Sequence, residues 1–146
     1  MRELKLLLAV VIFLFALEAF KADASVNVSR IVLTNNIKEA KALSSFDCKD
    51  KVHVLIPKVK ANGAHLLEAY WINPEGKRQQ YSRQEFTVGK KPVDVWVWLE
   101  FNPASGGRLF SSIDPSAGMG QFVGNWRVRV YLDEKLIEEK DFMVAC

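Results

Sequence analysis

The sequence predicts an all-β fold, in which about seven to eight short antiparallel strands form a two-sheet sandwich. The first observation is that apolar and polar residues alternate in short runs along most of the chain. The second is that turn-forming residues separate these runs, and the third is the near absence of a sustained helical period. With 49% hydrophobic and 25% charged residues, the composition is that of a globular domain, which argues against disorder, collagen and coiled coil.

The first 24 residues are typical of a cleaved signal peptide. Two basic residues near the start precede an apolar run of 12 residues, 6–17, and residues 22–24 have the small-x-small pattern expected before cleavage. The alternative is an uncleaved membrane anchor, but crossing a bilayer takes about 20 apolar residues. We therefore expect 1–24 to be removed and 25–146 to form one domain, secreted or periplasmic, with no stable membrane span.

Cys48 and Cys146 are the only cysteines. In an oxidising compartment, an even and minimal count predicts a single disulfide, Cys48 to Cys146. This bond would close a loop of about 100 residues and contribute roughly 4–5 kcal/mol at most. The alternatives are two free thiols or an intermolecular bond through Cys146. Because two cysteines and two histidines make no recognisable zinc spacing, we expect no metal site.

Charge and reactive residues argue against several classes of function. A net charge of +3 is too small to indicate nucleic-acid binding. His53 and His65 are the only histidines, and neither lies in the local signature of a nucleophilic triad. No lysine or helix follows the glycine-rich stretches in the pattern of a phosphate loop. We therefore expect neither enzyme activity nor a cofactor.

The first part of the domain predicts two strands joined by a crossover connection. Residues 26–33 change their buried face midway, which requires a bulge or a kink. Residues 35–43 favour a helical turn or two, capped by Asn35. Residues 52–56 then alternate as a strand that ends at Pro57.

A hairpin is expected next. Residues 65–72 alternate, so that Tyr70 and Trp71 lie on opposite faces. Residues 73–76 are a strong turn signal, since proline presets φ and glycine accepts positive φ. Residues 77–88 are polar and suit a solvent-exposed edge strand, whose charges deter edge-to-edge pairing.

The clearest alternation covers residues 93–101. Its apolar parity predicts a buried face and leaves Trp96 and Trp98 on the outer side. A long irregular stretch, 102–124, follows and contains a candidate short strand over 109–113.

The last segment predicts a hairpin. Residues 126–132 and 136–144 form its strands, and a tight turn joins them at 133–135. The parity of the second strand places Glu138 and Lys140 inward. A bulge, or a stretch that runs past the sheet edge, is needed to accommodate these charges.

The closing segment 124–133, with the sequence GNWRVRVYLD, resembles the ending common in exported bacterial immunoglobulin-like domains. Together with the face-switching first strand and Trp71 on the third strand, it makes the chain similar to the immunoglobulin-like superfold. The resemblance covers most of the mature domain, and it implies a fold but not a function. Antibody domains carry cysteines on their second and sixth strands, whereas Cys48 precedes the second strand here and Cys146 ends the last. In an immunoglobulin-like order these two positions lie at the same end of the sandwich.

Two surfaces hold the strongest candidate binding residues. The first is the outer pair Trp96 and Trp98, with Tyr70 on a neighbouring strand, because aromatic side chains give large contact area at low entropic cost. The alternative is that a loop covers them as a satellite core. The second is the long loop 102–124, whose apolar residues either dock onto a partner or pack under the sandwich. The full candidate set is Trp96, Trp98, Tyr70, Arg108, Phe110, Met119, Phe122, Arg127, Arg129 and Tyr131.

These features predict a secreted, non-enzymatic recognition or assembly domain. It would bind a protein or envelope partner through the long loop and the aromatic sheet face, while Arg127, Arg129 and Tyr131 line a second outer face. The alternative is a carbohydrate-binding module that uses Trp96 and Trp98.

Overall fold

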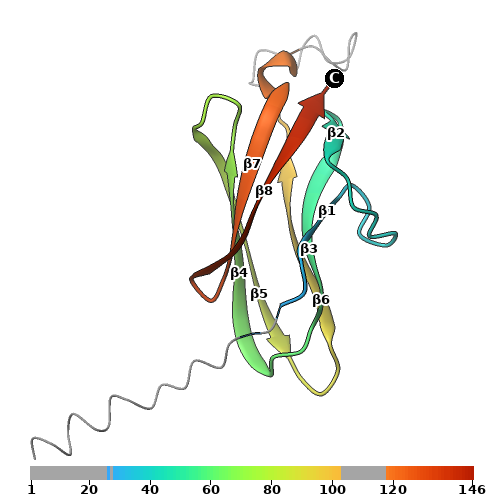
Figure 1. Cartoon of the computed structure of the whole chain (residues 1–146), viewed down its shortest axis with the longest axis vertical. Coiled ribbons are helices and arrows are strands. Elements are labelled where there is room, and N and C mark those ends of the chain that lie inside the picture. Colours follow the sequence, from blue (N-terminus) through green and yellow to red (C-terminus); the bar gives the residue numbers. More distant parts are fainter. Residues whose placement is uncertain (1–25, 27, 103–117) are drawn as a thin grey trace, which may run out of the picture.

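The computed structural model describes residue 26 and residues 28–102 and 118–146. They form two β-sheets that pack face to face, as Figure 1 shows. The first sheet has the order β1-β3-β6, with β1 (Val32–Thr34), β3 (Lys51–Val59) and β6 (Val93–Glu100). The second has the order β2-β8-β7-β4-β5, with β2 (Ser45–Asp47), β8 (Lys135–Ala145), β7 (Gly124–Leu132), β4 (Gly63–Ile72) and β5 (Arg78–Val88). The expected signal peptide and the candidate strand over 109–113 lie outside the described residues.

The two sheets confirm the predicted sandwich and its immunoglobulin-like strand order. Strands β1, β3 and β6 take the places of immunoglobulin strands A, B and E, and β4, β5, β7 and β8 take those of C, C′, F and G. Trp71 lies on β4 and is fully buried, in the strand where immunoglobulin domains carry their core tryptophan.

The core lies between the sheets and is filled by alternate residues of each strand. On β6 the burial alternates as predicted, because Val95, Val97 and Leu99 are buried and the residues between them are exposed. Aromatic rings form the centre: Trp126 stacks on Phe142 with ring centroids 6.3 Å apart, and Trp71 meets Phe142 edge-on at 6.1 Å. Since burying one large apolar side chain is worth about 1.5–3 kcal/mol, this cluster supplies a large share of the hydrophobic stabilisation.

One strand pair corrects the expectation of purely antiparallel sheets. β2 pairs with β8 in parallel, with Phe46 opposite Val144. The reason is the crossover after β1, which carries the chain from the three-stranded to the five-stranded sheet, where β2 runs in the same direction as β8. Phe46 is buried against Phe142 there, at 5.6 Å between ring centroids.

The crossover holds a single turn capped by Asn36, one residue later than predicted. The Asn36 side-chain oxygen accepts hydrogen bonds from the main-chain N–H of Lys38 at 3.0 Å and of Glu39 at 3.4 Å. The Ala40 N–H then donates to the Asn36 carbonyl at 3.0 Å. Asn36 is the better cap because its main-chain N–H is itself fixed by the Thr34 hydroxyl, 3.1 Å away.

Strand β3 does not end at Pro57 but continues to Val59 through a bulge. The register with β6 shifts between Ile56 and Val59, and Lys58 has a φ of 53°. The bulge removes Pro57 from the hydrogen-bonding ladder, which is where proline, having no N–H, is tolerated in a sheet. The Lys58 N–H donates instead to a carboxylate oxygen of Asp94 on β6, at 2.8 Å.

The closing hairpin of β7 and β8 confirms the predicted strands, and of the two alternatives for its second strand it has a bulge, at Ile137. Asp133 and Glu134 occupy the turn with φ values of 50° and 67°, as a type I′ turn requires. The register shifts between Val130 and Tyr131. Asp133 also fastens the turn to β4, because its carboxylate accepts the Leu66 N–H at 2.9 Å.

Glu138 and Lys140 lie on the inward parity of β8, and they bind the main chain at the start of β1. A carboxylate oxygen of Glu138 accepts the Ile31 N–H at 3.0 Å, and the Lys140 ammonium donates to the Ile31 carbonyl at 2.9 Å. The two charges also pair with each other at 3.5 Å. The side chains therefore replace a missing strand partner and join the two sheets at this edge.

The predicted disulfide between Cys48 and Cys146 is present and intramolecular. The two Cα atoms are 5.2 Å apart and 98 residues apart in the chain. They meet because β3 starts at the end of the sandwich where β8 finishes (Figure 1). In the described part of the chain, no helix is long and apolar enough to cross a membrane.

Candidate binding surfaces

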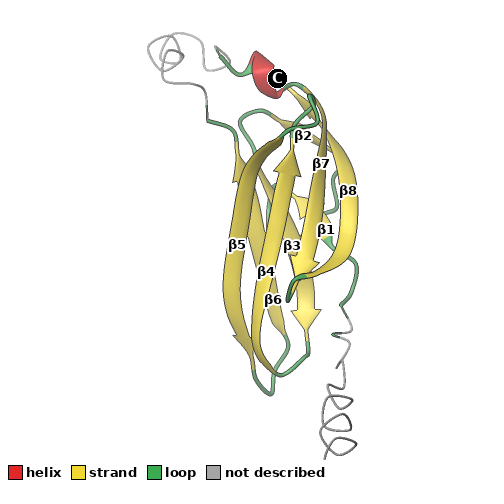
Figure 2. Ribbon diagram, turned by 90° about the vertical axis from the view of Figure 1, so that its left-hand side faces the viewer, coloured by secondary structure: helices red, strands yellow, loops and turns green. Residues whose placement is uncertain are grey.

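The outer side of the five-stranded sheet carries a group of aromatic and charged residues that we call the tyrosine–arginine face. Figure 2 looks onto this sheet, with β5, β4, β7 and β8 side by side. Every second side chain of each strand points to this outer side, so side chains from neighbouring strands lie next to one another here. The face consists of Glu68, Tyr70, Arg78, Tyr81, Arg127, Arg129, Tyr131, Glu139 and Asp141.

Three tyrosines form the centre of this face. Tyr70 lies directly opposite Tyr81 in the register of β4 and β5, and their ring centroids are 5.0 Å apart. Tyr131 on β7 meets Tyr70 edge-on at 5.4 Å. The guanidinium carbon of Arg78 lies over the Tyr70 ring, 5.2 Å from its centroid. This is the range of a cation–π contact, so Arg78 adds a positive charge to an aromatic cluster.

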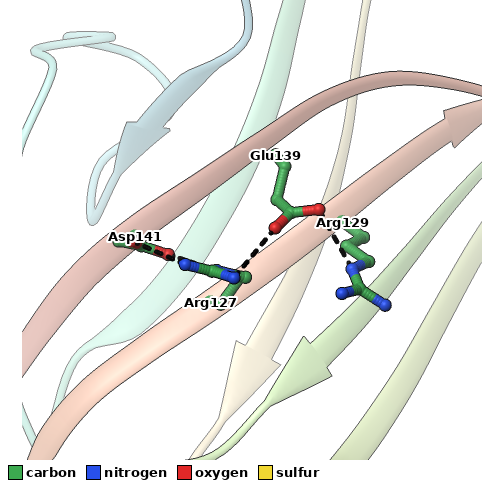
Figure 3. A network of polar contacts seen from close by, with 4 residues as sticks. All are labelled: Arg127, Arg129, Glu139 and Asp141. Atoms are coloured by element: carbon green, nitrogen blue, oxygen red, sulfur yellow. Dashed lines mark hydrogen bonds and ion pairs between the residues drawn. The ribbon is translucent and has the colours of Figure 1, made fainter.

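Ion pairs order the charges beside the tyrosines (Figure 3). Arg127 pairs with Asp141 at 2.6 Å and with Glu139 at 3.1 Å, and Arg129 pairs with Glu139 at 3.0 Å. The hydrogen bond from Arg127 lowers the pKa of Asp141. Exposed pairs of this kind add little to stability, so their main effect is to fix the guanidinium groups in place.

An open cavity of about 530 Å³ lies among these residues. Its walls include Glu68, Tyr70, Arg78, Arg129 and Tyr131 from three strands, with Glu134 at the β7–β8 turn. The Tyr81 hydroxyl donates to Glu68, and this hydrogen bond raises the pKa of Tyr81. Among the described residues Arg78 forms no ion pair, and its guanidinium contacts the Tyr70 ring.

A second surface, which we call the tryptophan groove, lies between the edge strands β5 and β6. Trp96 and Trp98 are 36% and 43% exposed, so no loop among the described residues covers them as a satellite core. They line a cavity of about 280 Å³ together with Asp94 and Val95 of β6 and Gln84 and Phe86 of β5. Tyr70 does not lie beside these tryptophans, because β4 belongs to the opposite sheet.

The candidate residues of the long loop divide into two groups. Met119 and Phe122 are buried, at 5% exposure each, and are therefore not available to a partner. Phe122 ends a short 3₁₀ helix, Gly120–Phe122, and its carbonyl accepts the indole N–H of Trp126 at 2.7 Å. Met119 and Phe122 thus close one end of the core. Arg108 and Phe110 lie outside the described residues.

The two histidines have structural surroundings. Burial lowers the pKa of His53, whose Nδ1 has no hydrogen-bond partner within the described structure. Burial also disfavours the charged form of His65, but the Asp133 carboxylate 2.7 Å from Nδ1 and the Ala61 carbonyl 2.8 Å from Nε2 together outweigh it, so the pKa of His65 is raised. Among residues 26, 28–102 and 118–146, no three potential metal ligands come together.

Sequence reasoning misses Arg78 and Tyr81, because the polar pattern of the segment that contains them predicts only an edge strand. The hairpin sequence does contain a signal for the pairing of Tyr81 with Tyr70. The turn at residues 73–76 sets the register of the two strands, and that register places Tyr81 opposite Tyr70. The contact of Tyr70 with Tyr131 depends on the pairing of β4 with β7. These strands lie about 60 residues apart in the chain, so no local pattern predicts the contact.

Comparisons with known proteins give similarities in structure only. No known family profile and no curated protein matches this sequence. An immunoglobulin-like protein from Pseudomonas aeruginosa is 18% identical with a TM-score of 0.46, and the match covers 85% of this chain and 99% of that one.

Two further solved structures match a part of a larger protein. An alkylpurine DNA glycosylase from Pseudomonas fluorescens is 7% identical with a TM-score of 0.45, and the match covers 84% of this chain and 31% of that one. A β-glucosidase from Listeria innocua is 13% identical with a TM-score of 0.46, and the match covers 84% of this chain and 16% of that one. None of these similarities supports a function for this chain.

Proposed function

We propose that the chain is a non-enzymatic recognition domain that binds a protein partner through the tyrosine–arginine face. The observation that carries the proposal is the cluster of Tyr70, Tyr81 and Tyr131 with the Arg78 guanidinium over its centre. Tyrosine and arginine are enriched at the energetically dominant positions of protein interfaces. Tyrosine has only two side-chain torsions, so it gives contact area at low entropic cost.

The geometry of this face supports binding without rearrangement. Its residues come from paired strands rather than loops, so their positions are fixed by the sheet register. The ion pairs of Arg127 and Arg129 hold the polar rim in place next to the tyrosines. An interface with an aromatic centre and a charged rim has the composition expected for a transient protein complex.

We place this activity outside the cytoplasm. The Cys48–Cys146 disulfide supports that location, because such bonds persist in oxidising compartments and are rare in the cytosol. The apolar segment at residues 6–17, with the small residues at 22–24, is the pattern that directs export.

A cross-linked capture experiment tests the proposed face. The tagged protein is incubated with an envelope extract, beside a Tyr81→Ser, Arg78→Ala variant and a Trp96→Ala, Trp98→Ala variant. The tyrosine–arginine variant should lose the specific partner, and the tryptophan variant should keep it. A partner that both variants retain would contradict binding through this face. Circular dichroism of both variants controls for loss of fold.

Carbohydrate binding by Trp96 and Trp98 is the second candidate. It is favoured by the combination of two exposed indoles with Asp94 and Gln84 in one groove, since sugars combine apolar ring faces with hydroxyl groups. A glycan array with the wild type and the Trp96→Ala, Trp98→Ala variant tests this function. Sugar binding that the variant abolishes would support it.

A further inference from the structure

The main-chain groups on the free edge of β6 have no strand partner on the side of the tryptophan groove in the described structure. β6 pairs with β3 alone, so one side of this strand has no strand neighbour in the described structure. On that side the Trp98 carbonyl accepts two side-chain hydrogen bonds from β5, from the Ser82 hydroxyl at 2.7 Å and the Gln80 amide at 3.3 Å. Trp98 therefore directs its main chain away from β3 and toward the groove.

The direction of the Trp98 carbonyl fixes that of its neighbours. In an antiparallel pair, consecutive residues direct their N–H and C=O alternately toward and away from the partner strand. Trp96 and Asp94 share the parity of Trp98, so their main-chain groups also point into the groove. The same alternation is seen at the opposite edge of this sheet, where the Leu33 carbonyl points away from β3 and accepts the Leu43 N–H at 2.8 Å.

The groove leaves room beside these main-chain groups. At this edge β6 is the last strand of its sheet and β5 is the last strand of the other, whereas constant-type immunoglobulin domains have a fourth strand beside the one that corresponds to β6. Here Gln84 lies on the same face of its sheet as the buried Leu67, yet it is exposed. Phe86 is only half-buried. The inner surface of β5 is thus uncovered where a strand paired with β6 would lie.

The side chains of the groove indicate what such a strand would carry. Apolar and aromatic surface is offered by Trp96, Trp98 and the half-buried Phe86. The Asp94 carboxylate accepts the Lys58 N–H, but it has no cationic partner among the described residues. A carboxylate beside two indoles favours a lysine or arginine side chain, through charge and cation–π attraction together.

We propose that an extended peptide segment of a partner protein, with alternating apolar and basic residues, adds to the edge of β6 as a further strand. Its main chain hydrogen-bonds to Asp94 and Trp96, and its basic side chain lies between the Asp94 carboxylate and the indoles. Main-chain groups two residues apart on a strand are about 6.6 Å apart, which is the repeat that an extended peptide matches. This site is separate from the tyrosine–arginine face, and it competes with carbohydrate for the same groove.

Selection from a displayed library of random linear heptapeptides, with the full oxidised chain as target, tests the proposal. The library should yield a family with alternating apolar and basic residues. Its best member, made as a synthetic peptide, is titrated by tryptophan fluorescence and compared with a copy N-methylated at alternate residues. Because N-methylation removes strand hydrogen bonds and leaves the side chains, it should weaken binding by about tenfold or more.

Matched variants distinguish strand addition at β6 from binding elsewhere on the molecule. Trp96→Ala should abolish binding, and Asp94→Asn should weaken basic peptides selectively, since an amide oxygen still accepts the Lys58 N–H. Tyr81→Ser should leave the affinity for the peptide unchanged, because Tyr81 lies on the tyrosine–arginine face. The peptide site can therefore be tested separately from the proposed protein-binding face. The proposal is overturned if no peptide family is enriched, or if N-methylation has no effect. It is equally overturned if the groove binds glycans and no peptide. A dimer of this chain that Trp96→Ala dissociates would overturn it too, because the occupant of the groove would then be a second copy of the chain.

Discussion

At the residue scale, His65 and Asp133 connect the closing hairpin to β4. The Nδ1 of His65 is 2.7 Å from the Asp133 carboxylate, and Nε2 is 2.8 Å from the Ala61 carbonyl. Both contacts are satisfied at once only when the imidazole is protonated, because both partners are acceptors. The raised pKa of His65 is therefore a property of the folded state.

The stability of the protein should depend on pH through His65. The pKa of His65 is above its usual 6.5 in the folded state, so the protonated imidazole adds to the free energy of unfolding. This stabilisation is fully present below the unfolded-state pKa and is lost as pH rises through the folded-state pKa. Urea unfolding of His65→Gln should accordingly lack that part of the pH dependence. His53→Gln serves as a control of opposite sign, since the lowered pKa of His53 removes stability as pH falls. Identical pH profiles for wild type and His65→Gln would contradict the prediction.

Lys140 should matter more than its position near the surface suggests. Lys140→Met removes the donor to the Ile31 carbonyl and leaves Glu138 without its cation, which we expect to cost about 1–3 kcal/mol of unfolding free energy. Lys135→Met is a matched control, because Lys135 is an exposed residue at the start of the same strand. Chemical denaturation measures both. A loss no larger than that of the control would show that the contact with Ile31 is energetically neutral.

At the scale of elements, strands with strict local alternation could be predicted from the sequence. β6 and β7 are examples, because their period of two requires no knowledge of a partner. The parallel pairing of β2 with β8 and the binding of Ile31 by Glu138 and Lys140 could not be predicted. Both join segments about 100 residues apart, and no local pattern encodes which distant segment a short strand will meet. Of the candidate site, the outward tryptophans were predictable for the same local reason, whereas the tyrosine cluster was not.

The disulfide should stabilise the sandwich without being required for the fold. It bridges a loop of 98 residues, for which the chain-entropy model gives up to about 4.7 kcal/mol. A Cys48→Ser, Cys146→Ser variant should therefore melt at a lower temperature and keep its β-sheet circular dichroism. Alkylation under denaturing conditions without reductant should find no free thiol in the wild type. Two reactive thiols in that assay would rule out the bond in the purified protein.

At the scale of the whole molecule, the four tryptophans divide equally between core and surface. Trp71 and Trp126 are buried between the sheets, and Trp96 and Trp98 are exposed at the groove. Acrylamide should therefore quench about half of the emission, with the remainder protected until unfolding. Trp96→Phe, Trp98→Phe should leave a blue-shifted spectrum that resists quenching. Complete protection in the wild type would show that the groove is covered, and would remove the basis for both of its proposed ligands.

The position of the disulfide has a further consequence for how this protein responds to proteases. Cys48 and Cys146 enclose β3 to β8 in one covalent ring. A single cut of the main chain anywhere inside that ring leaves both pieces joined by the disulfide, so the nicked molecule differs from the intact one only by the one water added in hydrolysis. The nicked molecule would separate into two bands on a denaturing gel only after reduction of the disulfide.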